Sequence, residues 1–364
     1  MMKYSTYQLS LLVTEQCNLK CAYCNCDKGR QRVMDIDIAK NSIDEVMRTI
    51  GNDRLNLLLM GGEPFLAFDR VREIVDYVRQ KYSKNNVTIK TVTNGTLVHG
   101  DVQLWLEANK DLFFASLSVD GDRDSHNKNR CNSFDDIDFD FFTHLYGNCS
   151  EASMVISPNT LEHFAHNVMS VEEMGFMVKC VLADDCVWDK ERDVGLLTEQ
   201  LSYLIEHYLS HQDKLPFTML RESLQNIGNT NTEKCRPWEN SHCMDVDGGK
   251  WGCHRCTPFY NNGTWNIKQD LISLVGCNLL KRCEECPVIS ICCACPAMVA
   301  SLCDKVELAE TMCALFKVVH MANAIFVARL FLECPNHVYL RSKKNKELQK
   351  MIDGAQTIIK AMKI

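Results

Sequence analysis

The first half of the chain alternates short apolar runs with longer amphipathic segments. The run Leu55–Met60 is almost continuously apolar, as is typical of a parallel strand buried on both faces. The pattern predicts six strands, at Gln8–Thr14, Leu55–Met60, Thr88–Thr93, Phe114–Val119, Ser153–Ser157 and Phe176–Leu182. It predicts helices between them, at Asp37–Ile50, Phe68–Tyr82, Asp101–Lys110, Phe134–Tyr146 and Asn159–Met174.

Repeated strand–helix units imply an α/β fold with a parallel sheet and right-handed crossovers. In such folds the functional residues gather at the carboxyl ends of the strands. From Cys235 onward this rhythm is lost, and Asp247-Gly248-Gly249 and Asn261-Asn262-Gly263 suit tight hairpin turns instead. Long helices are predicted at Glu191–His211 and Val306–Glu333. We therefore expect three parts, residues 1–183, 184–234 and 235–364.

Composition narrows the function classes. The chain has 364 residues with a net charge of -7, which argues against a nucleic-acid partner. The apolar stretch Val318–Leu332 is short and contains three polar residues, so we expect no membrane span, and we see no signal peptide. These features predict a cytoplasmic protein. Twenty-one cysteines in a reducing compartment indicate metal binding more than disulfides.

The first cysteine group follows the first predicted strand directly, as Cys17-x3-Cys21-x2-Cys24. Three thiolates on one short loop can hold three irons of a [4Fe–4S] cluster and leave the fourth iron open to a small molecule. Tyr23 places an aromatic ring at the edge of such a cluster. A zinc site that takes Cys26 as its fourth ligand is the alternative.

Further motifs occupy the ends of the next three strands. They are Gly61-Gly62-Glu63-Pro64, Thr93-Asn94-Gly95, and Ser118-Val119-Asp120-Gly121 followed by His126 and Arg130. Glycines allow a backbone to approach a ligand closely, and Glu63 offers a negative charge to an ammonium group. The planar donors of Arg130 suit a carboxylate.

In this order, these motifs resemble those of the radical SAM (S-adenosylmethionine) superfamily. The resemblance covers roughly the first half of the chain and implies a partial (β/α)6 barrel. It implies a SAM-binding [4Fe–4S] cluster on Cys17, Cys21 and Cys24. It also implies that the residues near SAM are Tyr23, Gly61, Gly62, Glu63, Pro64, Asn94, Ser118, Asp120 and Arg130.

The cysteines of the C-terminal part resemble the SPASM extension of radical SAM enzymes, a small domain that usually holds two auxiliary [4Fe–4S] clusters. The resemblance assigns one cluster to Cys235, Cys253 and Cys295, with Cys243 as the preferred fourth ligand and Cys256 and Cys277 as rivals. It assigns the other cluster to Cys283, Cys286, Cys292 and Cys313. Cys293 is an alternative to Cys292, because two residues instead of three separate Cys292 from Cys295.

An alternative reading of the C-terminal cysteines stays open at this point. The pairs Cys253-x2-Cys256 and Cys283-x2-Cys286 also have the form of a four-cysteine zinc site. Five cysteines outside these groups are expected to be ordinary buried thiols, at Cys131, Cys149, Cys180, Cys186 and Cys334.

The resemblance implies an enzyme that reductively cleaves SAM to a 5′-deoxyadenosyl radical, which then removes hydrogen from a substrate. SPASM enzymes mostly act on peptides, where they form thioether or carbon–carbon cross-links or oxidise a residue. Sulfatase-maturing members carry an acidic base directly after the Gly-x4-Cys cysteine, whereas this chain has His254, which can also act as a base. We therefore expect a maturase of ribosomally made peptides. The alternatives are a sulfatase-type formylglycine-generating enzyme, a radical SAM enzyme acting on a small molecule, and a non-enzymatic iron–sulfur or zinc module.

The expected partners follow from this reading. They are a precursor peptide or protein and an electron donor such as flavodoxin or ferredoxin. The first strand begins close to the start of the chain, so a separate protein or the lysine-rich tail from Arg341 is expected to bind a leader peptide.

Overall fold

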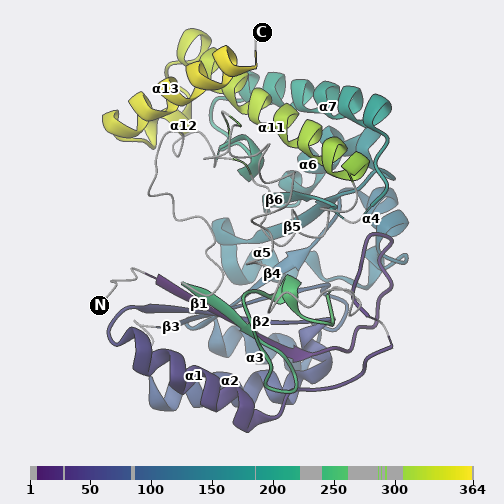
Figure 1. Ribbon diagram of the computed structural model, residues 1–364, viewed down its shortest axis with the longest axis vertical. Coiled ribbons are helices and arrows are strands. Elements are labelled where there is room, and N and C mark those ends of the chain that lie inside the picture. The colour runs from purple at the N-terminus through teal and green to yellow at the C-terminus, as the bar shows by residue number, and fades with distance from the viewer. Residues whose placement is uncertain are drawn as a thin grey trace. The chain divides into compact units, whose positions relative to one another are not determined.

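The strands form one eight-stranded sheet. The computed structural model describes residues 6–27, 29–82, 87–184, 186–221, 240–260, 286, 288, 292 and 306–362. Within it the sheet order is β6-β5-β4-β3-β2-β1-β7-β8 (Figure 1). The strands are β1 (Thr6–Thr14), β2 (Arg54–Gly61), β3 (Val87–Thr93), β4 (Phe113–Ser118), β5 (Glu151–Ile156), β6 (Met177–Leu182), β7 (Ser241–Met244) and β8 (Lys250–Trp251). The pairs from β1 to β5 are parallel, which confirms the predicted α/β class.

The helices follow the strands as the apolar spacing predicted. They are α1 (Ile36–Ile50), α2 (Phe68–Lys81), α3 (Asp101–Asn109), α4 (Arg123–Asn129), α5 (Phe139–Tyr146), α6 (Phe164–Glu173), α7 (Lys190–Ser210), α11 (Val306–Glu333), α12 (Val338–Arg341) and α13 (Asn345–Ala361). The helix α1 begins at Asp35, whose side chain caps it, and buries Ala39, Ile43 and Val46. Figure 1 shows α1 and α2 side by side beneath the first strands.

The predicted helix Phe134–Tyr146 is two elements instead of one. A short 3-10 turn covers Phe134–Asp136, and α5 starts only after Asp138. The Asp138 carboxylate accepts a hydrogen bond from the Phe141 amide at 3.0 Å, so it caps α5 and sets the boundary. The helix α4, which precedes this turn, has no apolar spacing and was not predicted.

The strand β7 extends the sheet beyond β1. It pairs with β1 in parallel, from Gln8 with Ser241 to Leu11 with Met244. The Tyr7 hydroxyl lies 2.9 Å from Nδ1 of His242, across the same pair of strands. The strands β7 and β8 form the hairpin predicted at Asp247–Gly249, and the second predicted hairpin, at 261–263, lies outside the described residues.

The chain divides into two compact units. One comprises Met1–Ser153, Glu173–Met177 and Lys234–Gln269, and the other comprises Met154–Glu172, Val178–Glu233 and Asp270–Ile364. In the second unit α11 packs against α7 and α13. The three-part division expected from the sequence, at 183/184 and 234/235, stays a prediction.

The helix α11 is longer than the apolar stretch considered in the sequence. Its 28 residues include a window with a mean hydropathy of 1.6, so by length and composition alone it could cross a membrane. The sequence predicted this helix with the same bounds, and the expectation that it does not span a membrane stays a prediction. Half of that window is buried inside the protein, as it also would be in a core helix.

Candidate functional site

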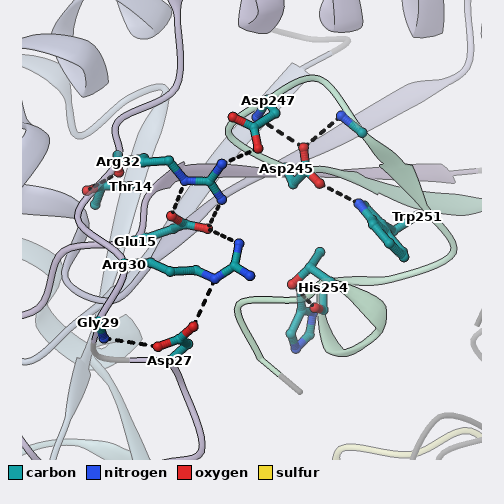
Figure 2. A network of polar contacts seen from close by, with 12 residues as sticks. Thr14, Glu15, Asp27, Gly29, Arg30, Arg32, Asp245, Asp247, Trp251 and His254 are labelled. Carbon is teal, nitrogen blue, oxygen red and sulfur yellow. Dashed lines mark hydrogen bonds and ion pairs between the residues drawn. The ribbon is translucent and has the colours of Figure 1, made fainter. Parts of the chain in front are cut away.

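The loop formed by residues 15–32, here called the cysteine loop, leaves the carboxyl end of β1 and is closed at its base. The Glu15 amide donates to the Arg32 carbonyl at 2.9 Å. The Glu15 carboxylate, whose side chain is only 2% exposed, accepts from Nε and Nη2 of Arg32 at 2.7 and 2.8 Å (Figure 2). Because a buried carboxylate requires a paired charge, this contact fixes both legs of the loop.

The glycine pair at the end of β2 lies against the start of the cysteine loop. The Glu63 amide donates to the Gln16 carbonyl at 2.7 Å. A side chain at Gly62 would place its Cβ 2.6 Å from Cβ of Cys17 and closer still to the Gln16 carbonyl. The glycines therefore allow the two backbones to approach each other, whereas the sequence suggested only that they admit a ligand.

The Glu63 side chain joins the ends of β2 and β3. Its carboxylate accepts from the Phe65 amide at 3.1 Å, the Thr93 hydroxyl at 2.8 Å and the Asn94 amide at 2.7 Å. Burial raises the pKa of Glu63 to about 6, although these donors and Arg130 act in the opposite direction. A contact between Glu63 and the SAM ammonium stays a prediction.

Asn94 connects the end of β3 to the cysteine loop. Its side-chain amide donates to Oδ1 of Asn18 at 2.9 Å, and Asn18 in turn donates to the Thr96 hydroxyl at 2.8 Å. Gly95 follows with φ of 81°, a conformation that favours glycine. The Thr-Asn-Gly motif thus forms a turn that holds one side of the loop.

Asp120 and Arg130 form a buried ion pair at the end of β4. Nε and Nη2 of Arg130 donate to the Asp120 carboxylate at 2.8 and 3.1 Å. The Tyr23 hydroxyl donates to the same carboxylate at 2.7 Å, and the guanidinium carbon lies 5.5 Å from the Tyr23 ring centre. Ser118 is buried at the end of the strand. The structure therefore brings Tyr23, Asp120 and Arg130 together as the motifs predicted.

The helix α4 supplies contacts that the sequence did not indicate. The Asn129 carbonyl accepts from the Ala22 amide at 2.8 Å, inside the cysteine loop. The Lys20 amide lies 3.3 Å from Sγ of Cys131, and Cys131 has φ of 58°. Cys131 is exposed, so its expected burial was wrong. An isolated polar helix with a strained residue after it gives no periodic signal from which these contacts could be predicted.

The hairpin segment 240–260 contacts the cysteine loop at two points and the end of β2 at a third. Arg32 forms an ion pair with Asp247, the Asp27 amide donates to the Phe259 carbonyl at 2.8 Å, and the Tyr260 hydroxyl donates to the Gly61 carbonyl at 3.1 Å. Figure 2 shows Arg32 between the carboxylates of Glu15 and Asp247. The contact of Tyr260 was not predicted, because its partner lies 199 positions earlier in the chain.

Three thiols gather within this hairpin segment. Sγ of Cys253 lies 3.5 Å from Sγ of Cys256. Cys243 is buried, and burial first, then nearby Cys253, raises its pKa well above the ordinary value. The preferred fourth ligand, Cys243, and its rival, Cys256, therefore both lie near Cys253.

His254 lies between these cysteines in sequence, on a 3-10 turn, and packs against Tyr260 with ring centres 5.2 Å apart. Burial lowers the pKa of His254 to about 4, so the ring is neutral near neutral pH. A neutral imidazole can accept a proton, and its role as a base stays a prediction.

The other predicted cluster ligands are only partly described. Cys286 and Cys292 are half-buried, and Cys313 is exposed on α11. The remaining predicted ligands and alternatives lie outside the described residues, at Cys235, Cys277, Cys283, Cys293 and Cys295. Among the expected buried thiols Cys334 is buried, whereas Cys149 is exposed at the end of a 3-10 turn and Cys180 and Cys186 are half-buried.

The cysteine loop offers a donor set suited to a [4Fe–4S] cluster. In the described part of the chain, no three Cys, His, Asp or Glu side chains converge on a single metal ion. Such a cluster takes one thiolate per iron, so its ligands surround it instead of meeting at one point. Burial is the main cause that raises the pKa of Cys21 to about 11, and Cys24 and Cys17 add to it. The three thiols therefore lie within electrostatic reach of one another and fit the cluster.

Comparison with known proteins now decides the family. Residues 11–138 match the sequence profile of the Radical SAM superfamily. Residues 11–138 belong to the radical SAM superfamily. This match covers the strands β1 to β4 and every motif of the cysteine loop and the adjoining strand ends, which confirms the resemblance seen in the sequence.

Curated relatives of this radical SAM chain match it over a limited length. A cysteine-type anaerobic sulfatase-maturating enzyme from Clostridium perfringens is 31% identical over 134 residues, which are 34% of this chain and 35% of the relative. The matched segment thus spans between 24% and 38% of the length of such curated relatives.

Solved structures resemble the chain over a greater length. The fold of anSMEcpe with bound AdoMet and a Cp18Cys peptide superposes with a TM-score of 0.62 at 20% identity, over 88% of this chain and 99% of that chain. Streptococcus suis SuiB bound to its precursor peptide SuiA gives a TM-score of 0.56 at 14% identity, over 79% of this chain and 71% of that chain. These likenesses confirm a partial-barrel radical SAM fold.

Proposed function

We propose that this chain is a peptide maturase that cleaves SAM reductively and abstracts hydrogen from a residue of a ribosomally made precursor peptide. The observation that carries the proposal is the placement of the cysteine loop. Contacts from the ends of β2, β3 and β4 hold it, through Gly62, Asn94 and Asp120. In parallel α/β folds this edge of the sheet is where ligands bind.

The residues around the loop have distinct proposed roles. Cys17, Cys21 and Cys24 would hold a [4Fe–4S] cluster, which on one-electron reduction supplies the electron that splits SAM into methionine and a 5′-deoxyadenosyl radical. Arg130 offers planar donors to the SAM carboxylate. The buried polar residues at the ends of β2, β3 and β4 orient the loop and keep water out.

The C-terminal cysteines are proposed to hold two auxiliary [4Fe–4S] clusters. Cys253 belongs to the first, and its neighbours Cys243 and Cys256 compete for the place of a further ligand. Cys286, Cys292 and Cys313 belong to the second. An auxiliary cluster can accept the electron that remains on the substrate after hydrogen removal, which balances an oxidative modification.

The peptide substrate is proposed from the structural neighbours. Both anSMEcpe and SuiB are described with bound peptides. We propose in addition a cytoplasmic location, reduction by flavodoxin or ferredoxin, and a separate leader-binding protein. A thioether or carbon–carbon cross-link is the proposed product, because the position after Cys253 holds His254 instead of an acidic residue.

The first test combines metal analysis with product analysis. Protein purified without oxygen is expected to hold about twelve irons, as three cubane clusters require, and to release 5′-deoxyadenosine from SAM after reduction. The variant Cys24→Ala is expected to lose this release and to keep the iron of the auxiliary clusters. The matched control is Cys149→Ala, which removes an exposed cysteine and should keep both. Zinc in place of iron, or unchanged release by Cys24→Ala, would contradict the proposal.

Formylglycine formation is the second candidate, favoured by the likeness to anSMEcpe over nearly the whole of that chain. The two candidates differ in the mass of the product. A cross-linked peptide loses two hydrogen atoms, whereas conversion of a cysteine to formylglycine replaces its sulfur by oxygen and also removes two hydrogen atoms. Mass spectrometry after incubation of the reduced enzyme with precursor peptides and with a sulfatase-type cysteine peptide separates them.

A further inference from the structure

One carboxylate at the end of β4 collects donors from two separate parts of the chain. Asp120 accepts from the Tyr23 hydroxyl at 2.7 Å, and from Nε and Nη2 of Arg130 at 2.8 and 3.1 Å. Tyr23 belongs to the cysteine loop and immediately precedes Cys24. Arg130 lies 10 positions beyond Asp120, just after α4.

Asp120 and Arg130 are removed from water, and Tyr23 is half-buried. Asp120 is 1% exposed and Arg130 is 7% exposed. The Tyr23 hydroxyl donates to the buried Asp120 carboxylate. A buried charge pair of this kind contributes more to a fixed geometry than to stability, since each ion loses its hydration.

The pairing is one-sided. Asp120 engages Nε and Nη2 of Arg130, and within the described residues Nη1 makes no hydrogen bond. The guanidinium is planar, so fixing two nitrogens fixes the direction of the third. The backbones beside Tyr23 and Arg130 are also joined, because the Asn129 carbonyl accepts a hydrogen bond from the Ala22 amide at 2.8 Å.

We infer that Asp120 is a positioning residue for the SAM site, which sets the Arg130 guanidinium and Tyr23 of the cysteine loop in one rigid unit. The inference rests on the proposed function. It assigns to Asp120 a role through its neighbours and not a contact with SAM. Without the carboxylate, Arg130 can turn its donors elsewhere, and the loop segment next to Cys24 loses its connection to β4.

The test replaces Asp120 by asparagine and measures SAM binding by electron paramagnetic resonance of the reduced cluster. The asparagine side chain has almost the same size as that of aspartate. Its NH₂ group is a donor, so it cannot accept the hydrogen bond that one carboxylate oxygen accepts from Arg130 or Tyr23. The SAM concentration that gives half of the spectral change is expected to rise about tenfold, as the loss of one charge-assisted contact implies. The spectrum without SAM is expected to stay the same, because the three cysteine ligands remain.

Two further variants make the result specific. Tyr23→Phe removes only the hydroxyl and is expected to weaken SAM binding less than Asp120→Asn does. The double variant is expected to weaken SAM binding by less than the sum of the two single effects, since both changes act on the same contact of Asp120. The matched control is Asp135→Asn, which neutralises an exposed carboxylate paired with Arg123 near α4 and should bind SAM normally.

The outcomes distinguish a failure of the proposed function from a failure of the positioning role of Asp120. Wild-type protein whose spectrum does not respond to SAM refutes the proposed function. A normal wild-type response, with unchanged half-saturation in both Asp120→Asn and Tyr23→Phe, refutes only the positioning role. If Asp120→Asn does not retain iron, the test rests on Tyr23→Phe alone. Weakened SAM binding by this variant supports the positioning role, and unchanged SAM binding refutes it.

Discussion

Replacement of Glu63 by glutamine removes a buried negative charge while it keeps the shape of the side chain. Burial raises the pKa of Glu63 to about 6, from an ordinary value of 4.5. A carboxyl group with a raised pKa binds its proton more tightly in the folded state. The folded state is therefore favoured at low pH, and this contribution is lost as the pH rises from the ordinary pKa through about 6. The difference between the two pKa values corresponds to about 2 kcal/mol.

The assay is urea unfolding of wild-type and Glu63→Gln protein, without oxygen, at about pH 7 and about pH 4. The free energy of unfolding of the wild type, relative to the variant, is expected to be about 2 kcal/mol higher at the lower pH. The NH₂ group of glutamine cannot accept a hydrogen bond, so the variant also loses one of the three hydrogen bonds that Glu63 accepts. The resulting decrease in the free energy of unfolding does not depend on pH. The comparison between two pH values therefore isolates the charge.

A control with the opposite sign accompanies this measurement. Glu45 pairs with Lys250 at 2.8 Å, and this contact lowers its pKa. Its contribution is present above the ordinary pKa and lost as the pH falls, so Glu45→Gln is expected to show a small change in the other direction. Infrared spectra read the same titration directly, as a carboxyl band that appears below about pH 6 and is missing from Glu63→Gln. A difference between wild type and Glu63→Gln that does not vary with pH would refute the argument.

Two other variants test the auxiliary cysteines and the base of the cysteine loop. Cys286→Ala is expected to lower the iron content and to reduce product formation more than SAM cleavage; an unchanged iron content would count against an auxiliary cluster at this position. Arg32→Gln leaves the buried Glu15 carboxylate without its bidentate partner and is expected to lower the free energy of unfolding by about 3 kcal/mol in urea. Its control, Arg123→Gln, breaks an exposed pair with Asp135 and should change stability little, so equal effects of the two would show that the burial of Glu15 does not matter.

The sequence predicted those parts of the fold that depend on local pattern. Strands such as β2 and helices such as α1 have apolar spacing that decides their type, and observed boundaries lie within a few residues of the predicted ones. The helix α4 has the sequence Arg-Asp-Ser-His-Asn-Lys-Asn and no apolar face, so its burial depends on partners elsewhere in the chain. One local signal was available and unused, namely the capping residue Asp138 before α5.

The strand β7 shows a second reason why some elements cannot be predicted from the sequence. Its sequence, Ser-His-Cys-Met, is short and polar, yet all four residues are buried. It becomes a strand because β1 offers an unpaired edge, and His242 finds the Tyr7 hydroxyl 235 positions away. Pairing over such a separation leaves no periodic trace in the segment itself. The hairpin turn, by contrast, was predicted from Asp247-Gly248-Gly249 alone.

The candidate site was predicted by residue type but not by partner. The motifs named Tyr23, Asp120 and Arg130 as neighbours of a ligand, and the structure shows that they first bind one another. The same holds for Glu63, which joins Thr93 and Asn94. A motif records which positions matter, whereas the hydrogen bonds between positions arise only when the strand ends are brought to one edge of the sheet.

This arrangement has a consequence for how the site forms. The cysteine loop is held less by apolar packing than by polar contacts with β2, β3, β4 and α4, through Gln16, Asn18, Ala22 and Tyr23. Each of those partners lies at the carboxyl end of a different strand or in the helix that follows one. The loop can therefore adopt its final geometry only after four strands have paired, because a single buried polar contact is costly until its partner is in place.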